Sequence, residues 1–144
     1  MRAGDVMTTG AATVKPGASL AEAARLMIEH RISGLPVVDD GGGLVGMVTE
    51  GDFLRREKRL IDVLLDEAQA RELARDLSAR RVEDIMSTDL VSVGVEAPLN
   101  DIVDAMERRN VRRIPVLDQG RVVGIVSRAN LVLALLRKAE RPDA

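Results

Sequence analysis

The sequence predicts an α+β fold made of two copies of one β-α-β-β-α unit. Motifs of the first half of the chain recur in the second half in the same order, and each copy places amphipathic helical spacing between short β-rich runs. We expect a first repeat over residues 1–56, a helical connector over 57–81, a second repeat over 82–137 and a frayed tail over 138–144.

The repeat rests on matched segments at a nearly constant offset. The matching pairs are Asp5–Met7 with Asp84–Met86, Leu35–Asp39 with Ile114–Asp118, and Leu44–Thr49 with Val122–Ser127. The offset changes at a glycine-containing turn, where Asp40–Gly43 faces the shorter Gln119–Arg121. Length changes are tolerated in turns, so this difference supports the alignment.

Each copy opens with a short strand and an amphipathic helix. Thr13-Val14 and Ser92-Val93 have the residue types of short strands, and helical spacing follows over Leu20–Glu29. The apolar positions of that helix are Leu20, Ala23, Ala24, Met27 and Ile28. Ser19 with Glu22 predicts a capping box at its start.

A hairpin and a closing helix complete each copy. The β-rich runs Leu35–Asp39 and Leu44–Thr49 flank a glycine-rich turn, which predicts a hairpin. A helix then begins at about Glu50 in the first copy and at about Arg128 in the second. Between the copies, Arg55–Arg81 keeps leucines at helical spacing among many charges, which predicts a long amphipathic helix, continuous or broken.

Composition excludes several classes of function. The chain carries 21 basic and 23 acidic side chains, which argues against the basic surface of a nucleic-acid-binding protein. It has no cysteine and a single histidine, His30, so we expect neither disulfides nor a metal site. No apolar run approaches the roughly 20 residues of a membrane span, and the first residues lack the apolar core of a signal peptide. These features predict a cytoplasmic protein.

The repeated motifs resemble those of a tandem pair of CBS domains, named after cystathionine beta-synthase. The motifs are Asp-Val/Ile-Met at the start, an apolar-Pro-Val strand, and Gly-x-Val-Thr/Ser-x-x-Asp/Asn near the end of each copy. The resemblance covers Gly4–Leu54 and Val82–Leu136. Thr49–Arg56 is also similar to a bacterial CBS subgroup in which a BON domain often follows, although we expect no such domain after Arg137.

This resemblance implies how the copies fold together and what they do. It implies two repeats packed sheet to sheet about a pseudo-two-fold axis, with related clefts for an adenine nucleotide: AMP, ADP, ATP, NAD or S-adenosylmethionine. It implies a regulatory, non-enzymatic module that forms a homodimer. The nucleotide acts as a regulatory ligand, no catalytic cofactor is expected, and a change in conformation or dimer arrangement signals to an unidentified regulated protein.

The nucleotide contacts predicted in the first copy lie where a strand runs into a helix. Such a junction offers unpaired backbone N–H groups and the positive end of the helix dipole, which favour phosphate. Within the resemblance, the Thr49 hydroxyl contacts phosphate and the Asp52 carboxylate accepts hydrogen bonds from both ribose hydroxyls. The alternative is that Thr49 and Asp52 only cap the helix.

The second copy carries Ser127 for phosphate and Asn130 for ribose at the matching positions. Because Asn130 is neutral, we expect it to hold ribose more weakly, by about 1 kcal/mol. Arg113 and Arg128 are further phosphate candidates, and the first copy has Gly34 in place of Arg113. The alternative for both arginines is a solvated surface position.

The adenine ring is expected to lie against apolar walls and backbone amides. The residues predicted to line it are Thr13, Val14, Leu35, Pro36, Met47, Ile114 and Pro115. Ordinary core packing is the alternative for each of them, and both descriptions can hold for one residue, because ligand pockets are mostly apolar.

Two other classes of function stay open from the sequence. Asn130 together with Gly34 favours a structural dimerisation module with vestigial nucleotide clefts. An enzyme is disfavoured, because no nucleophile and base stand at motif spacing. Gly41–Gly43 lacks the lysine and the following helix of a phosphate loop, so it predicts a tight turn instead.

Overall fold

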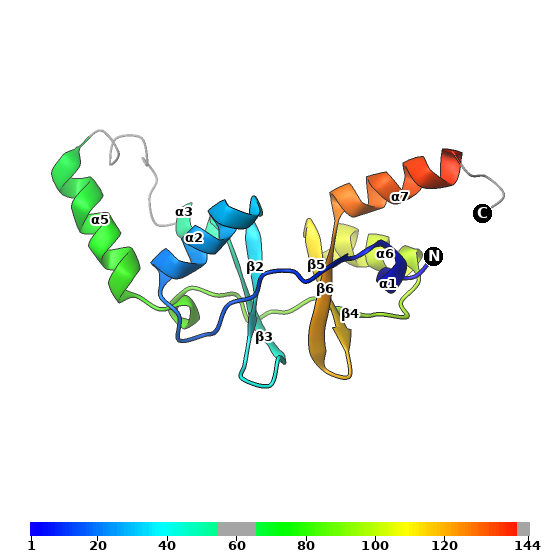
Figure 1. The fold of residues 1–144 in the computed structure, drawn as a ribbon, viewed down its shortest axis with the longest axis horizontal. Coiled ribbons are helices and arrows are strands. Elements are labelled where there is room, and N and C mark those ends of the chain that lie inside the picture. Colours follow the sequence, from blue (N-terminus) through cyan, green and yellow to red (C-terminus); the bar gives the residue numbers. More distant parts are fainter. Residues whose placement is uncertain (55–65, 141–144) are drawn as a thin grey trace. The chain divides into compact units, whose positions relative to one another are not determined.

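A computed structural model describes residues 1–54 and 66–140 of the chain (Figure 1). The described residues fall into two compact units. The first-repeat unit is built from residues between Ala12 and Leu90. The second-repeat unit joins Met1–Ala11 to the chain from Val91 onward.

The first-repeat unit contains a helix, a hairpin and further helices. Its elements in chain order are α2 (Leu20–His30), β2 (Gly34–Val38), β3 (Leu44–Thr49), α3 (Glu50–Leu54), α5 (Glu67–Ala79) and a 3-10 turn, Val82–Asp84. Strands β2 and β3 pair antiparallel, and α5 packs against α2. The Ser19 hydroxyl accepts a hydrogen bond from the Glu22 N–H at 3.1 Å, which is one of the two hydrogen bonds of the predicted capping box.

The second-repeat unit repeats this plan with a wider sheet. Its elements are α1 (Ala3–Val6), β1 (Thr8–Thr9), β4 (Val93–Gly94), α6 (Leu99–Arg109), β5 (Arg113–Asp118), β6 (Arg121–Ser127) and α7 (Arg128–Glu140). The sheet has the order β1-β6-β5-β4, with β4 parallel to β5 and the other pairs antiparallel. An α+β fold with two related halves is therefore confirmed.

Each unit contains the segment that leads into the other repeat. Strand β1, which precedes the first repeat, pairs with β6 of the second, where Thr8 lies opposite Ile125. In the first-repeat unit, Ser87 exchanges backbone hydrogen bonds of 3.0 and 2.8 Å with Met47. The compact units therefore do not follow the repeat boundaries drawn from the sequence, because the leading segments cross over.

The crossing of the leading segments explains why a methionine recurs at Met7 and Met86 and a glycine at Gly46 and Gly124. A Cβ atom at Gly124 would lie 2.6 Å from Met7 Sδ and 2.8 Å from the Thr8 carbonyl oxygen. A Cβ atom at Gly46 would lie 2.6 Å from Met86 Sδ. The methionine of each leading segment thus packs onto a strand at a point where only glycine leaves room.

Each unit buries its own apolar core. The first core consists of Val14, Leu20, Ala23, Met27, Leu35, Val37, Val48 and Val82. The second consists of Ala3, Ile102, Met106, Ile114, Val116 and Val126. Helices α2 and α6 contribute residues at i, i+3 and i+4 spacing, whereas the strands contribute alternate residues, so the sequence periods match the observed burial.

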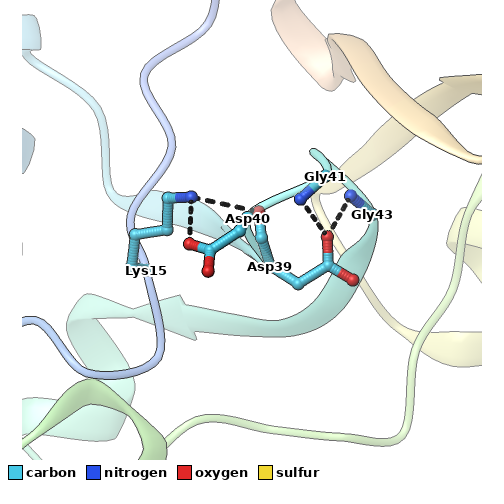
Figure 2. A network of polar contacts seen from close by, with 5 residues as sticks. All are labelled: Lys15, Asp39, Asp40, Gly41 and Gly43. Carbon is cyan, nitrogen blue, oxygen red and sulfur yellow. Dashed lines mark hydrogen bonds and ion pairs between the residues drawn. The ribbon is translucent and has the colours of Figure 1, made fainter.

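The hairpin turn of the first-repeat unit is fixed by one carboxylate (Figure 2). Asp39 Oδ1 accepts hydrogen bonds from the backbone N–H groups of Gly41 at 3.0 Å and Gly43 at 2.8 Å. Beside it, Lys15 Nζ donates to Asp40 Oδ1 at 2.9 Å. The predicted tight turn is confirmed. The Asp39 carboxylate bonds to N–H groups of the turn itself, and the Asp40 carboxylate bonds to the neighbouring Lys15.

Strand β2 tolerates Pro36 because the parallel pairing with Val14 begins at the Pro36 carbonyl group and does not use a Pro36 N–H. The Val14 N–H donates to the Pro36 carbonyl oxygen at 3.1 Å, and the Val14 carbonyl oxygen accepts from the Val38 N–H at 2.9 Å. This short parallel bridge starts on the carbonyl of Pro36. The N–H that proline lacks is therefore not needed.

The structure differs from expectation in a few places. The connector contains helix α5, whereas the part of the predicted connector helix over 55–65 lies outside the described residues. Helix α7 continues to Glu140, so residues 138–140 are helical although they were expected in the tail. Thr13-Val14 contributes a single bridge to Val37 and no extended strand. Packing of the repeats about a pseudo-two-fold axis stays a prediction.

Candidate functional site

The first corner is the junction between β3 and α3, here comprising Ser33, Gly34, Thr49, Glu50 and Asp52. Asp52 is 7% exposed, and its Oδ2 accepts hydrogen bonds from the Thr49 N–H at 2.7 Å and from Thr49 Oγ1 at 3.3 Å. These bonds satisfy a backbone N–H that the helix itself leaves unpaired. A carboxylate and a hydroxyl, the groups predicted to hold ribose and phosphate, therefore lie in direct contact.

The second corner is the junction between β6 and α7, here comprising Arg112, Arg113, Ser127, Arg128 and Asn130. Asn130 Oδ1 accepts from the Ser127 N–H at 2.8 Å and from Ser127 Oγ at 3.0 Å. In return, the Asn130 N–H donates to Ser127 Oγ at 3.2 Å. The second corner therefore forms a reciprocal cap of the capping-box type.

Capping, which the sequence left open as the alternative, describes what Asp52, Ser127 and Asn130 do in the structure, and the Thr49 hydroxyl donates to Asp52. The two descriptions are compatible. A carboxylate or amide oxygen has more than one lone pair, and a hydroxyl can rotate towards a different partner. Assignment of Thr49, Asp52, Ser127 and Asn130 to ribose and phosphate stays a prediction.

The structure adds one residue that the sequence did not indicate. Asn130 Nδ2 donates to Thr8 Oγ1 at 3.2 Å, although 122 residues separate them in the chain. Thr8 reaches Asn130 because β1 pairs with β6. The signal that could have found it is the repeat itself, since the leading segment of each copy carries a hydroxyl directly after its methionine.

The two candidate arginines lie at the second corner. Arg113 begins β5 and is paired in register with Ser127. Arg128 is the first residue of α7 and is exposed. Both predicted phosphate contacts are thus brought close to Ser127, whereas Gly34 occupies the register position opposite Thr49 in the first corner.

The residues predicted to line adenine are mostly buried. Val14, Leu35 and Ile114 belong to the two apolar cores. Pro36 and Pro115 are fully buried, Met47 is half-buried, and Thr13 is exposed. Core packing therefore accounts for most of their side chains, and an adenine contact at these positions stays a prediction.

A small cavity lies beside Asp52 in the first-repeat unit. It measures about 30 Å³ and is lined by Leu20, Asp52, Phe53, Leu73, Asp76, Leu77, Arg80 and Ile85. A cavity of this size holds about one water molecule. It is therefore too small for a nucleoside, and a ligand contacting Asp52 needs another approach.

One carboxyl group in the described part of the chain has a clearly shifted pKa. The hydrogen bond from Lys15 and its positive charge hold the pKa of Asp40 below its ordinary value. A depressed carboxyl pKa stabilises the fold at pH values above the unfolded pKa, and this contribution is lost as pH falls through the folded pKa. Asp40 is fully exposed, so the contribution is small.

Residues 1–54 and 66–140 contain no group of three or more His, Cys, Asp or Glu side chains able to hold a metal ion. Within the same part of the chain, no helix combines the length and apolarity needed to cross a membrane.

Comparison with known sequences points to one family. The family model described as "CBS domain" matches residues 3–59 and 82–137. The chain is 36% identical over 129 residues to the CBS domain-containing protein YhcV of Bacillus subtilis, covering 90% of this chain and 81% of that protein. It is also 32% identical to the homoserine O-acetyltransferase of Methanococcoides burtonii, covering 85% of this chain but only 22% of that enzyme.

Comparison with solved structures agrees. CBSX2 of Arabidopsis thaliana, a CBS-pair protein, matches with a TM-score of 0.83 and 30% identity over 97% of both chains. CBSX2 in complex with AMP matches with a TM-score of 0.75 and 32% identity, covering 96% of this chain and 98% of that one. The CBS domain pair of MJ0100 in complex with 5′-methylthioadenosine and S-adenosyl-L-methionine matches with a TM-score of 0.72 and 27% identity, covering 94% and 99%.

Proposed function

The chain belongs to the CBS-domain family, and from this premise we propose that it is a cytoplasmic regulatory module that binds an adenine nucleotide at its two corners. The observation that carries the proposal is the duplicated strand-to-helix corner, with Thr49 and Asp52 in one copy and Ser127 and Asn130 in the other. Relatives of the same fold have been crystallised with AMP and with S-adenosyl-L-methionine, which supports an adenosine compound as the ligand.

The corner geometry suggests how each group acts on a ligand. Asp52 Oδ2 holds the Thr49 N–H, and the carboxylate accepts additional hydrogen bonds from ribose hydroxyls. The Thr49 hydroxyl turns from Asp52 to a phosphate oxygen. Ser127 and Asn130 act likewise at the second corner, where Arg113 and Arg128 add positive charge.

The regulatory step is a shift between conformations or dimer arrangements. A ligand produces such a shift only if it binds one arrangement more tightly than the other. No group on the chain performs chemistry in this mechanism, so the nucleotide is a signal and an unidentified regulated protein reads the change.

A dimerisation module is the second candidate, and helix α7 favours it. Four large apolar side chains of α7 are exposed: Val132, Leu133, Leu135 and Leu136. The run Leu131–Leu136 places apolar side chains on all sides of the helix, and an exposed apolar patch is typical of an interaction site, so this face is suited to a second copy of the chain. This candidate predicts a homodimer whether or not a nucleotide binds.

Thermal unfolding in the presence of AMP, ADP, ATP, NAD or S-adenosylmethionine tests the proposal. A ligand at 100 times its Kd adds about 2.7 kcal/mol of stability, which raises Tm by about 5–10 °C for a chain of this size. Circular dichroism is the suitable readout, because the chain has no tryptophan or tyrosine.

Variants of capping residues identify the site. Asp52→Ala and Asn130→Ala should each reduce the ligand-induced shift. Asp66→Ala is the matched control, because the Asp66 side chain also caps a helix, α5, through the Gln69 N–H at 3.1 Å, but has no proposed ligand role. An unchanged shift in both site variants contradicts the residue assignment, and no shift with any of the five compounds contradicts the proposal itself.

A further inference from the structure

The two corners have the same backbone geometry. The Glu50 N–H donates to the Ser33 carbonyl oxygen at 2.9 Å, and the Arg128 N–H donates to the Arg112 carbonyl oxygen at 3.1 Å. In each corner the helix begins at the residue directly after the second strand of the hairpin. The first N–H of the helix is hydrogen-bonded to the residue that directly precedes the first strand of that hairpin. The corners can therefore be compared position by position.

The charges at the matched positions are opposite. Glu50 in the first corner is replaced by Arg128 in the second, and Ser33 is replaced by Arg112. Asp52 is replaced by the neutral Asn130. Among the described residues, the first corner is thus acidic and the second corner is basic on the same backbone.

Arg128 occupies a position that a helix does not favour for a cation. It is the first residue of α7, and α7 has no acidic residue in its first turn, whereas α3 has both Glu50 and Asp52 there. The positive end of the helix dipole stabilises anions and disfavours a cation. A residue that departs from local preference in this way is expected at a functional position.

The orientation of the Asn130 amide agrees with the positive charge of the second corner. A backbone N–H can only donate, so the atom 2.8 Å from the Ser127 nitrogen must be the oxygen of Asn130. Nδ2 then points to Thr8 Oγ1 and offers N–H groups at that edge. Asp52, as a carboxylate, offers only acceptors.

We propose that the residue pair Glu50 and Arg128 sorts adenosine compounds between the corners by charge. The second corner takes a phosphorylated adenosine through Arg128, Arg112 and the N–H groups of Asn130. The first corner, where Glu50 opposes the phosphate contact of Thr49, binds phosphorylated adenosine more weakly. It prefers an adenosine compound that is neutral or positively charged, whose ribose hydroxyls donate to Asp52. This inference rests on the proposed function, because it assigns ligand classes to the same two corners.

Paired binding measurements test the sorting. AMP and adenosine are titrated by calorimetry into the wild-type chain, Arg128→Glu and Glu50→Arg. Arg128→Glu should weaken AMP binding at least about tenfold at low ionic strength, leave adenosine affinity unchanged, and raise Tm because the helix dipole favours the acid. Glu50→Arg should leave the existing AMP affinity unchanged and add a second AMP per chain.

The outcomes separate the inference from the proposed function. Equal loss of AMP and adenosine in Arg128→Glu, or unchanged AMP affinity, overturns the sorting while adenosine binding stands. If neither adenosine nor any of AMP, ADP, ATP, NAD and S-adenosylmethionine binds the wild-type chain, the proposed function fails, and inorganic pyrophosphate followed by phosphorus NMR becomes the probe. Pyrophosphate binding that Arg128→Glu abolishes supports the basic corner as the anion site, whereas absent or unaltered pyrophosphate binding overturns it.

Discussion

At the scale of single residues, two glycines show why the repeated motifs are conserved between the copies of this chain. Gly46 and Gly124 each lie beneath the methionine of a crossing segment. The nearest backbone atom to a Cβ at Gly124 is the Thr8 oxygen at 2.8 Å, and at Gly46 it is the Ser87 oxygen at 3.1 Å. A methionine side chain can shift more easily than a backbone carbonyl, so Gly124 is the tighter position.

Gly124→Ala is therefore expected to destabilise the chain by about 1–3 kcal/mol, and Gly46→Ala by less. Chemical denaturation followed by circular dichroism measures both. Gly94→Ala is the control, because its Cβ would meet only the Leu117 oxygen at an ordinary 4.0 Å, and it should be close to neutral. Met7→Ala in the Gly124→Ala background should recover part of the loss.

Equal losses of stability in Gly124→Ala, Gly46→Ala and Gly94→Ala would contradict this account. Such a result would show that the close approach of the methionines does not add to the free energy lost on substitution.

At the scale of elements, helix α5 is held differently from the helices of the repeats. It contributes no buried residue, and its half-buried Leu73 and Leu77 line the same small cavity as Leu20 of α2. Helix α2, in contrast, buries Leu20, Ala23 and Met27. Few buried apolar contacts mean a small free energy of local opening.

Hydrogen exchange should show this difference. Amides of Glu67–Ala79 are expected to exchange with a smaller opening free energy than those of Leu20–His30. Exchange measured by mass spectrometry on peptides covering the two helices provides the comparison. Equal protection would mean that α5 opens only together with the core of the first-repeat unit.

At the scale of the whole molecule, the exposed apolar face of α7 is the surface on which we expect a second copy of the chain to pack. Leu135 is 67% exposed and Leu136 is 53% exposed, although six consecutive residues from Leu131 to Leu136 are apolar. Burying such a face against a second copy would remove apolar surface from water at roughly 25 cal/mol per Å². The homodimer belongs to both candidate functions.

A double substitution, Leu135→Glu with Leu136→Glu, is expected to convert a dimer to a monomer in light scattering. Ala74→Glu on the exposed side of α5 is the control and should leave the mass unchanged. A dimer that survives the double substitution places its interface elsewhere, and a monomeric wild-type chain contradicts the dimer.

The sequence by itself determined the α+β class, the two repeats, most of the helix and strand positions, and the Ser19 cap of α2, whereas it left the Thr49–Asp52 cap open as an alternative. These features depend on hydrogen bonds and periodicity within a few residues, which residue spacing records directly. The tertiary structure decided which segments cross between the units, why Gly124 lies under Met7, and that Thr8 contacts Asn130. Those contacts join residues far apart in the chain, so no local pattern specifies them. The same holds for the opposite charges of the two corners, whose meaning appears only once the backbone hydrogen bonds place Arg128 and Glu50 at equivalent positions.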